Sequence, residues 1–326
     1  MHKMRRRGFL AVAFAAPFLP LRHALAQAAP PVVAYLGIET GAARPEFDAF
    51  MAGMRQLGHA DGGDVVIDVR MVPFRAEELA RAAAALVARK PAVLVASQPT
   101  LDAARAATAT IPIVARMTYD PVASGLVKSL ARPDGNLTGV SSYSSSLYGK
   151  RLEIAKELIP GLGRVAILHA DLSPTWNKTL ALLQADAKTL ALDLVPVLAH
   201  RPEDLPAAFD AAAAAGAGAM LPIRSPVTVG SRVQIALLAA AHRLPAVYDD
   251  REFCEAGGLI SYGADLRALH RRLAYFVDRI LHGAAPAELP IEEPTVFELV
   301  VNAGAAKALG LILPPALLVR ADQVID

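Results

Sequence analysis

The sequence predicts an α/β protein made of two doubly wound, Rossmann-like lobes that are joined by three hinge crossings. From residue 32 onward, short and almost continuously apolar runs alternate with longer segments of helical periodicity. Parallel strands that helices bury on both faces give this alternation. The alternation is interrupted at residues 131–146 and then begins again, which indicates two similar halves.

Four strand-helix units make up the predicted first lobe. Each unit places an apolar run before a segment whose apolar residues recur at helical spacing. The last strand runs into a polar turn, in which Asp120 before a proline is typical of a helix N-terminus. The strands are VVAYLGI, DVVIDVRM, AVLVA and IPIVAR, and the helices that follow them are expected at residues 45–57, 76–88, 100–109 and 122–130.

The second lobe is predicted to repeat this pattern after the segment ARPDGNLTGVSSYSSS. That segment contains a proline, the turn signal Asp134-Gly135 and a serine-rich end, so we interpret it as a crossing between the lobes. Beyond it, helices are expected at 147–158, 174–190, 203–215 and 227–243, and the strands are RVAILHA, LDLVPVL, AGAMLPI and LPAVYD.

The rest of the chain is predicted to pass between the lobes twice more. A long amphipathic helix at 266–281 precedes the last crossing, and the strand TVFELVVN and a short helix follow it. The three crossings are expected near residues 137–142, 258–263 and 290–296. The expected N-terminal lobe comprises residues 31–138 and 264–291, and the C-terminal lobe comprises residues 139–262 and 295–326.

Residues 1–26 have the form of a cleavable signal peptide. Four basic residues among the first seven precede the apolar run GFLAVAFAAPFLPL, and Ala24-Leu25-Ala26 places small residues where a signal peptidase cleaves. The sequence RRGFL at residues 6–10 also fits the twin-arginine pattern. The run is shorter than the roughly 20 apolar residues of a membrane span. We therefore expect export to the periplasm, with cleavage near Ala26.

Charge and cysteine content exclude several classes of function. Removing residues 1–26 takes away five of the 33 lysines and arginines and none of the 31 acidic residues, which leaves a net charge of about −3. A nucleic-acid partner is not expected, because phosphate contacts need a basic surface. Cys254 is the only cysteine and the eight histidines lack metal-ligand spacing, so neither a metal site nor another cofactor is expected.

Linear motifs of catalysis are absent from the sequence. There is no GxSxG, HExxH or GxxxxGK[ST]. A G-x-G-x-x-A string at residues 161–166 precedes a predicted strand, whereas the dinucleotide-binding fingerprint follows a strand and opens a helix. The protein is therefore not expected to be an enzyme. The alternatives are an exported α/β enzyme whose catalytic residues form no linear motif, and a ligand-binding sensor domain.

Polar and aromatic residues gather in the loops that follow the predicted strands. The carboxyl ends of the strands in both lobes should face one cleft, where open α/β sheets bind their ligands. Several of these residues also have a structural explanation, because Ser97, Thr118 and Asp120 are ordinary helix caps, and Trp176 or Tyr248 can pack in a core. The candidate ligand-binding residues are Glu39, Thr40, Ser97, Gln98, Thr100, Thr118, Tyr119, Asp120, Asp171, Trp176, Arg224, Tyr248 and Asp249.

These residue types are suited to binding a ligand, and no sequence motif marks a catalytic centre among them. Hydroxyls and free backbone N–H groups at helix N-termini bind carboxylates. The acidic side chains among the candidates can hold an ammonium group, and the aromatic rings can enclose an apolar or aromatic body. A small organic solute is the expected ligand.

Three segments resemble the ABC-transporter substrate-binding protein family, in its branch of tryptophan/tyrosine-binding TrpX-like proteins with the type I periplasmic binding fold. They are IPIVARMTYDPVASGLVKSLARPDGNLTGVSS, YDDREFCEAGGLISYGADL and PTVFELVVNAGAAKALGLILPPALLVRADQVID. The resemblance covers residues 31–326. It implies two lobes that close over a solute and deliver it to a membrane permease driven by an ATPase. The protein is expected to be a monomer.

Two features of this chain depart from the family pattern. Ser97-Gln98-Pro99 stands where relatives often have a turn rich in glycine and threonine, and Arg116-Met117 replaces smaller residues before the sequence DPV. An arginine or methionine there reshapes the expected pocket. The ligand that the resemblance and the aromatic candidates imply is an aromatic or branched amino acid, or an aromatic carboxylate.

Overall fold

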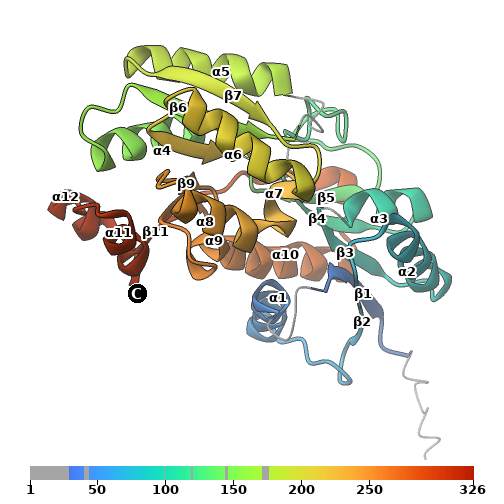
Figure 1. Ribbon diagram of the computed structural model, residues 1–326. Coiled ribbons are helices and arrows are strands. Elements are labelled where there is room, and N and C mark those ends of the chain that lie inside the picture. The colour runs from blue at the N-terminus through green and yellow to red at the C-terminus, as the bar shows by residue number, and fades with distance from the viewer. Residues whose placement is uncertain (1–28, 40–43, 99, 119, 144–145, 171–175) are drawn as a thin grey trace, which may run out of the picture.

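Figure 1 shows a computed structural model of the 326-residue chain. The structure describes residues 29–39, 44–98, 100–118, 120–143, 146–170 and 176–326. The expected signal peptide lies outside this part of the chain. Within these ranges, no helix has both the length and the apolar character to cross a membrane.

The first lobe is built on a parallel five-stranded sheet with the strand order β2-β1-β3-β4-β5. One face packs against α1 and α10, where Phe50 and Phe276 are buried, and the other face packs against α2 and α3. The strands are β1 (Val32–Ile38), β2 (Val66–Val72), β3 (Val93–Ser97), β4 (Ile113–Met117) and β5 (Leu137–Ser141). The helices are α1 (Pro45–Gln56), α2 (Ala76–Ala88), α3 (Leu101–Ala107) and α10 (Leu266–Leu281).

The fourth helix that the sequence predicts for this lobe, at residues 122–130, does not form. Turns and bends take its place. The Asp120 carboxylate accepts hydrogen bonds from the backbone of Val122 and Ala123, each at 3.0 Å, and the chain then bends at Gly125, whose φ is +71°. Because a left-handed glycine so early in the segment ends helical geometry, a single turn forms instead of a helix.

The second lobe contains two sheets that adjoin at a parallel bridge between Met220 and Ala246. The strand orders are β7-β6-β8 and β12-β11-β10-β9, and the pairing of β10 with β11 is antiparallel, whereas the others are parallel. The strands are β6 (Arg164–His169), β7 (Asp193–Leu198), β8 (Ala219–Pro222), β9 (Val247–Tyr248), β10 (Ile260–Ala264), β11 (Phe297–Asn302) and β12 (Gln323–Ile325). The predicted α/β class with two lobes is confirmed (Figure 1).

Helices of the second lobe follow the sequence pattern with one break. The helix predicted at 227–243 is two helices, because the backbone leaves helical geometry at Ser231, directly after Gly230. The short α9, α12 and β12 were not predicted. The helices are α4 (Ser146–Leu158), α5 (Trp176–Thr189), α6 (Leu205–Ala214), α7 (Pro226–Gly230), α8 (Arg232–Ala241), α9 (Arg251–Glu255), α11 (Ala303–Leu309) and α12 (Pro315–Arg320).

Two of the crossings between the lobes lie side by side. The backbone N–H of Ser141 donates to the carbonyl of Glu292 at 2.7 Å, and the N–H of Glu292 donates to the carbonyl of Gly139 at 3.1 Å. The lobe boundary that we expected between residues 138 and 139 falls within β5, which pairs with β4 as far as Ser141. The other crossing leads from β10 almost directly into α10, which packs on the first lobe (Figure 1).

A buried histidine ties the loop before β2 to the end of α10. His59 Nδ1 lies 2.6 Å from Asp64 Oδ2, and its Nε2 lies 3.0 Å from Asp278 Oδ1. Burial of the ring opposes protonation, but the hydrogen bonds to the two carboxylates outweigh it and raise the pKa of His59 above its usual 6.5. A folded-state pKa above the unfolded value means that this stabilisation is complete below the unfolded pKa and is lost as the pH rises through the folded pKa.

We therefore expect His59→Gln to lower the free energy of unfolding by about 1 kcal/mol at pH 6 and by less at pH 8.5. Urea unfolding at the two pH values measures this difference. His200→Gln, at an exposed histidine, is the control and should leave the pH dependence as in the wild type. An equal loss at both pH values would contradict the role of the protonated ring.

Candidate functional site

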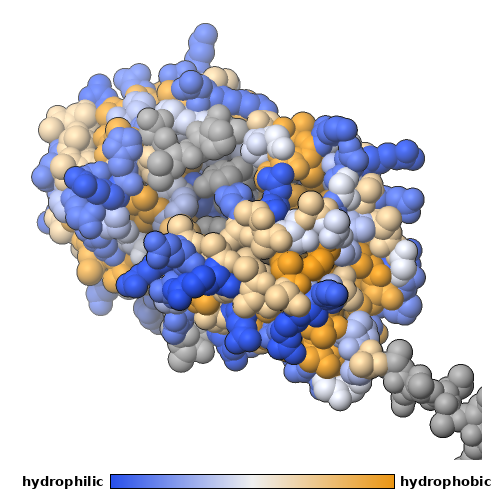
Figure 2. All heavy atoms as spheres, turned by 90° about the vertical axis from the view of Figure 1, so that its right-hand side faces the viewer, coloured by the Kyte–Doolittle hydropathy of each residue, from blue (hydrophilic) through white to orange (hydrophobic). Residues whose placement is uncertain are grey.

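A cavity of about 810 Å³ lies between the two lobes. Its first-lobe wall comes from the ends of β1 to β4 and the beginning of α1, and its second-lobe wall comes from the turn after β8, from α7 and α8, and from the beginning of α9. Figure 2 shows the hollow in this face of the molecule. The cavity thus lies where both sets of strands end, as the sequence pattern predicts.

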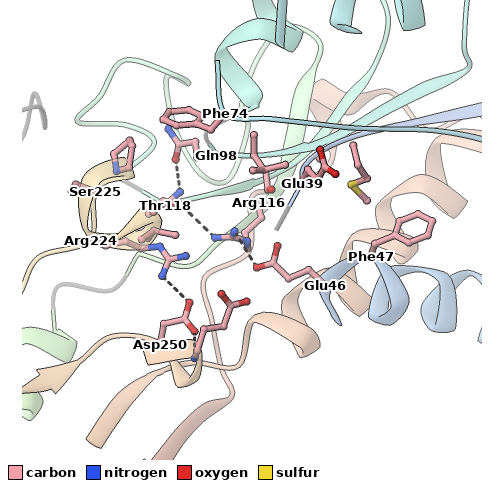
Figure 3. Close-up of a pocket in the computed structure, with 18 of the residues that line it drawn as sticks. Glu39, Glu46, Phe47, Phe74, Gln98, Arg116, Thr118, Arg224, Ser225 and Asp250 are labelled. Carbon is pink, nitrogen blue, oxygen red and sulfur yellow. Dashed lines mark hydrogen bonds and ion pairs between the residues drawn. The ribbon is translucent and has the colours of Figure 1, made fainter. Parts of the chain in front are cut away.

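Five of the predicted ligand-binding residues line the cavity: Glu39, Ser97, Gln98, Thr118 and Arg224. The Gln98 side-chain carbonyl accepts a hydrogen bond from the backbone N–H of Thr118 at 2.6 Å, so the turns after β3 and β4 are tied together. Figure 3 shows these two residues beside Arg116, with Arg224 on the opposite wall.

Two predicted residues of the first lobe have structural roles outside the cavity. The buried Thr100 hydroxyl donates to the carbonyl of Leu36 at 2.9 Å, which holds the turn after β3. The Asp120 carboxylate caps its own turn and pairs with Lys178 Nζ of α5, in the other lobe, at 3.0 Å. Burial opposes its charge, but these partners outweigh it and lower the pKa of Asp120.

Three predicted residues of the second lobe also do not line the cavity. Trp176 stacks on His169 with ring centroids 3.8 Å apart and packs against a core cluster of the second lobe. Tyr248 is fully buried and stacks on Phe253 at 4.6 Å. Asp249 lies behind the wall, where it pairs with Arg224 at 3.3 Å. The remaining candidates, Thr40, Tyr119 and Asp171, lie outside the described residues.

The first-lobe wall carries an arginine and a glutamate that sequence reasoning did not select as ligand contacts. Arg116 projects from β4, and its terminal nitrogen NH2 lies 3.4 Å from Glu46 Oε1 of α1 (Figure 3). His270 Nε2 lies 3.5 Å from the second oxygen of Glu46. Burial disfavours the charge of Glu46, but the neighbouring imidazole and arginines outweigh burial and lower its pKa. Burial, aided by the charge of Arg116, lowers the pKa of His270 and outweighs the carboxylate of Glu46, which raises it.

The second-lobe wall carries a denser network of charges. Arg224 lies 2.9 Å from Asp250 and 3.3 Å from Asp249, and these carboxylates, against the effect of burial, raise its pKa. Arg232 lies 3.5 Å from Glu252. Burial and the charge of Asp250 raise the pKa of Glu252 to about 7, although Arg232 opposes this. The cavity therefore offers charged groups of both signs from both lobes.

An apolar and aromatic wall lies beside the charged residues. Tyr35 packs edge-on against Phe47 with centroids 4.9 Å apart, and Arg44 lies over the Phe47 ring at 5.1 Å. Met71 and the exposed Phe74 also line the cavity. Such surfaces accept an aromatic or aliphatic body.

Comparisons with known proteins agree with this architecture. A model of the family described as "ABC transporter substrate binding protein" matches residues 35–325. The chain belongs to this family.

Relatives of this substrate-binding protein include a tyrosine-binding protein of Clostridioides difficile, which is 24% identical over 281 residues, 85% of this chain and 81% of the relative. A conserved domain protein from Vibrio cholerae has a solved structure with a TM-score of 0.79 and 27% identity, and the match covers 90% and 99% of the two chains. The structure of an ABC domain from Streptococcus pneumoniae in complex with L-Trp has a TM-score of 0.80 and 22% identity, and the match covers 91% and 100%. The type I periplasmic binding fold is thereby confirmed.

Several of the site residues that sequence reasoning missed lie inside secondary structure. Arg116 carries one usable signal, because it is a charged residue in a strand that is otherwise apolar and buried. Glu46 and Phe47 are indistinguishable from residues that favour the first turn and the packed face of an ordinary helix. Phe74 carries a weaker signal, because it is an exposed aromatic residue in the loop that follows β2.

Tyr248→Phe tests the structural role of Tyr248 in this substrate-binding protein. Within the described part of the chain its buried hydroxyl has no hydrogen-bond partner. We expect ligand affinity to be unchanged and the free energy of unfolding to be equal or higher by up to about 1 kcal/mol, because an unsatisfied polar atom is removed. Calorimetric titration and urea unfolding measure the two quantities. A tenfold loss of affinity would place Tyr248 at the ligand.

Proposed function

We propose that this protein is an exported receptor of an ABC importer, which binds a small organic solute in the periplasm and delivers it to a membrane permease driven by an ATPase. The observation that carries the proposal is the cavity of about 810 Å³ between two lobes of this family's fold. Its volume lies within the roughly 300–1,000 Å³ of small-molecule sites. The proposed contacts are Glu39, Gln98, Thr118, Arg116 and Arg224.

The proposed ligand is an aromatic amino acid. Tyr35, Phe47 and Phe74 supply an aromatic wall, and the neighbouring arginines and acids supply partners for a carboxylate and an ammonium group. The tyrosine-binding relative and the complex with L-Trp support this ligand class. A branched amino acid has no aromatic ring for the aromatic wall, and an aromatic carboxylate has no ammonium group for the acidic side chains.

Closure is proposed to occur by bending at the three crossings, which divide the chain into residues 31–138 with 264–291 and residues 139–262 with 295–326. The neighbouring hydrogen bonds of Ser141, Glu292 and Gly139 make the first and third crossings a common hinge. A ligand that contacts both walls favours the closed arrangement, because it binds that state more tightly.

A thermal-shift panel tests the proposed function. Mature protein is unfolded and refolded to remove bound solute, and is then heated with L-tyrosine, L-tryptophan, L-leucine, phenylacetate or glucose. An aromatic amino acid is expected to raise the midpoint most, because a ligand that binds only the folded state stabilises it by mass action. Glucose is the negative control. The absence of a shift with every amino acid and with phenylacetate would contradict the proposal.

A further inference from the structure

Arg116 is a buried cation in a strand that is otherwise apolar. Its β4 neighbours Val114, Ala115 and Met117 are fully buried, and the Arg116 side chain is only 3% exposed. The guanidinium nevertheless lines the cavity between the lobes (Figure 3). A charged group in this position is costly unless strong partners satisfy it.

The partners of Arg116 in the described part of the chain are weak. One terminal nitrogen, NH1, donates to the Thr118 and Ser142 hydroxyls, and the other, NH2, donates to Glu46, each at 3.4 Å, near the upper limit for a hydrogen bond. Within the described part of the chain, the buried Nε of Arg116 has no hydrogen-bond partner. Arg224, across the cavity, instead has two carboxylates at 2.9 and 3.3 Å. Arg116 therefore has donors to spare.

Glu46 places a negative charge directly beside these donors. It is 28% exposed, lines the cavity and is held in its charged form. His270 is buried on its other side, 3.5 Å from the second carboxylate oxygen, and burial lowers the pKa of the ring despite Glu46. The next residue on α1 is Phe47, whose ring belongs to the aromatic wall.

An α-amino acid carries its carboxylate and ammonium groups on one carbon, so its two charges lie as close together as those of Arg116 and Glu46. We propose that Arg116 binds the α-carboxylate and Glu46 binds the α-ammonium group, which makes the pair the specificity-determining element for an α-amino acid. This inference rests on the proposed function and selects amino acids over aromatic carboxylates. The end of the planar guanidinium lines the cavity, and its terminal nitrogen beside Glu46 keeps a second N–H that can donate to a ligand carboxylate.

A ligand series tests the pairing in the wild-type protein. Calorimetric titration compares L-tyrosine with L-tyrosinamide, which lacks the carboxylate, and with 3-(4-hydroxyphenyl)propionate, which lacks the ammonium group. Each analogue is expected to bind about 30-fold or more weakly than the amino acid, because one charge-assisted contact is lost and its partner stays unpaired. If L-tryptophan is the tighter ligand, L-tryptophanamide and 3-indolepropionate replace the analogues.

Variants assign each group of the ligand to its residue. Arg116→Gln should lower the affinity for the amino acid by about 30-fold or more and leave the affinity for the amide unchanged. The preference for the acid over the amide should therefore disappear. Glu46→Gln should abolish the preference for the amino acid over the propionate in the same way. Arg55→Gln, at an exposed arginine of α1, is the charge-matched control and should keep both preferences.

An Arg116→Gln protein that keeps the wild-type preference for acid over amide would overturn the assignment. If that variant does not fold, the wild-type series still decides, because equal affinities for L-tyrosine and its amide would refute a carboxylate site. Failure of every amino acid to bind would instead refute the proposed function, so the two failures are distinct.

Discussion

Gly139→Ala is expected to lower the free energy of unfolding by more than about 3 kcal/mol. Gly139 lies in β5 with a φ of +134°, in the region of the backbone map that favours glycine. A Cβ at this position would lie 2.1 Å from the carbonyl oxygen of Ala115 and 2.7 Å from its nitrogen, both in the neighbouring strand β4. Backbone atoms of a central strand cannot move away as a flexible side chain can, so the two strands must separate.

The effect of Gly139→Ala also reaches the hinge, because its carbonyl accepts the hydrogen bond from Glu292 that joins two crossings. Urea unfolding measures the change as a lower midpoint at the same slope. Gly135→Ala is the matched control, since its φ is +75° but no atom lies within 4 Å of the added Cβ. Backbone strain alone should cost about 1 kcal/mol there. Equal losses in the two variants would contradict the proposed clash.

Arg224→Ala is expected to destabilise the second lobe by about 3 kcal/mol. The Arg224 side chain is 17% exposed and neutralises Asp249 and Asp250, whose side chains are 10% and 5% exposed. Without the guanidinium, two adjacent carboxylates stay in a poorly solvated wall and lose the cation that pairs with both of them in the described part of the chain. The second oxygen of Asp250 also caps α9 through the N–H of Glu252 at 2.8 Å, so repulsion between the acids disturbs the beginning of this helix.

Two further variants separate this effect from the loss of any ion pair. Arg201→Ala breaks an exposed pair with Asp204, in which the arginine is 73% exposed, and should cost less than about 1 kcal/mol. Asp249→Asn in the Arg224→Ala background removes one of the two unpaired charges and should restore part of the stability. Urea unfolding follows all three proteins. No gain from the second substitution would contradict a charge-based explanation.

The regular part of the fold follows from the sequence because hydrophobic periodicity records burial. Continuous apolar runs such as VVAYLGI became strands buried on both faces, and α2 and α10 have the predicted bounds. The failures occurred where one residue overrides the pattern. Gly125 ends the helix expected at 122–130, and the break at Ser231 divides the helix expected at 227–243.

The site was predictable only as far as strand ends define it. Glu39 and Gln98 follow strands and line the cavity, as the topology of parallel sheets requires. Arg116 and Glu46 lie within a strand and a helix that are far apart in the sequence, and only the tertiary fold brings their side chains together. Tyr248 shows the converse, since an aromatic residue at a strand end can turn into the core as easily as toward a ligand.

Native mass spectrometry of the mature protein tests the central claim, which is that the cavity between the lobes receives one small solute and returns it unchanged. Refolded protein is incubated with the amino acid that gives the largest thermal shift, and the complex and the released solute are weighed. We predict a one-to-one complex and, after a long incubation, a solute of unaltered mass. A solute converted to another mass would contradict a receptor and identify an enzyme, and the absence of any complex would contradict the assigned cavity.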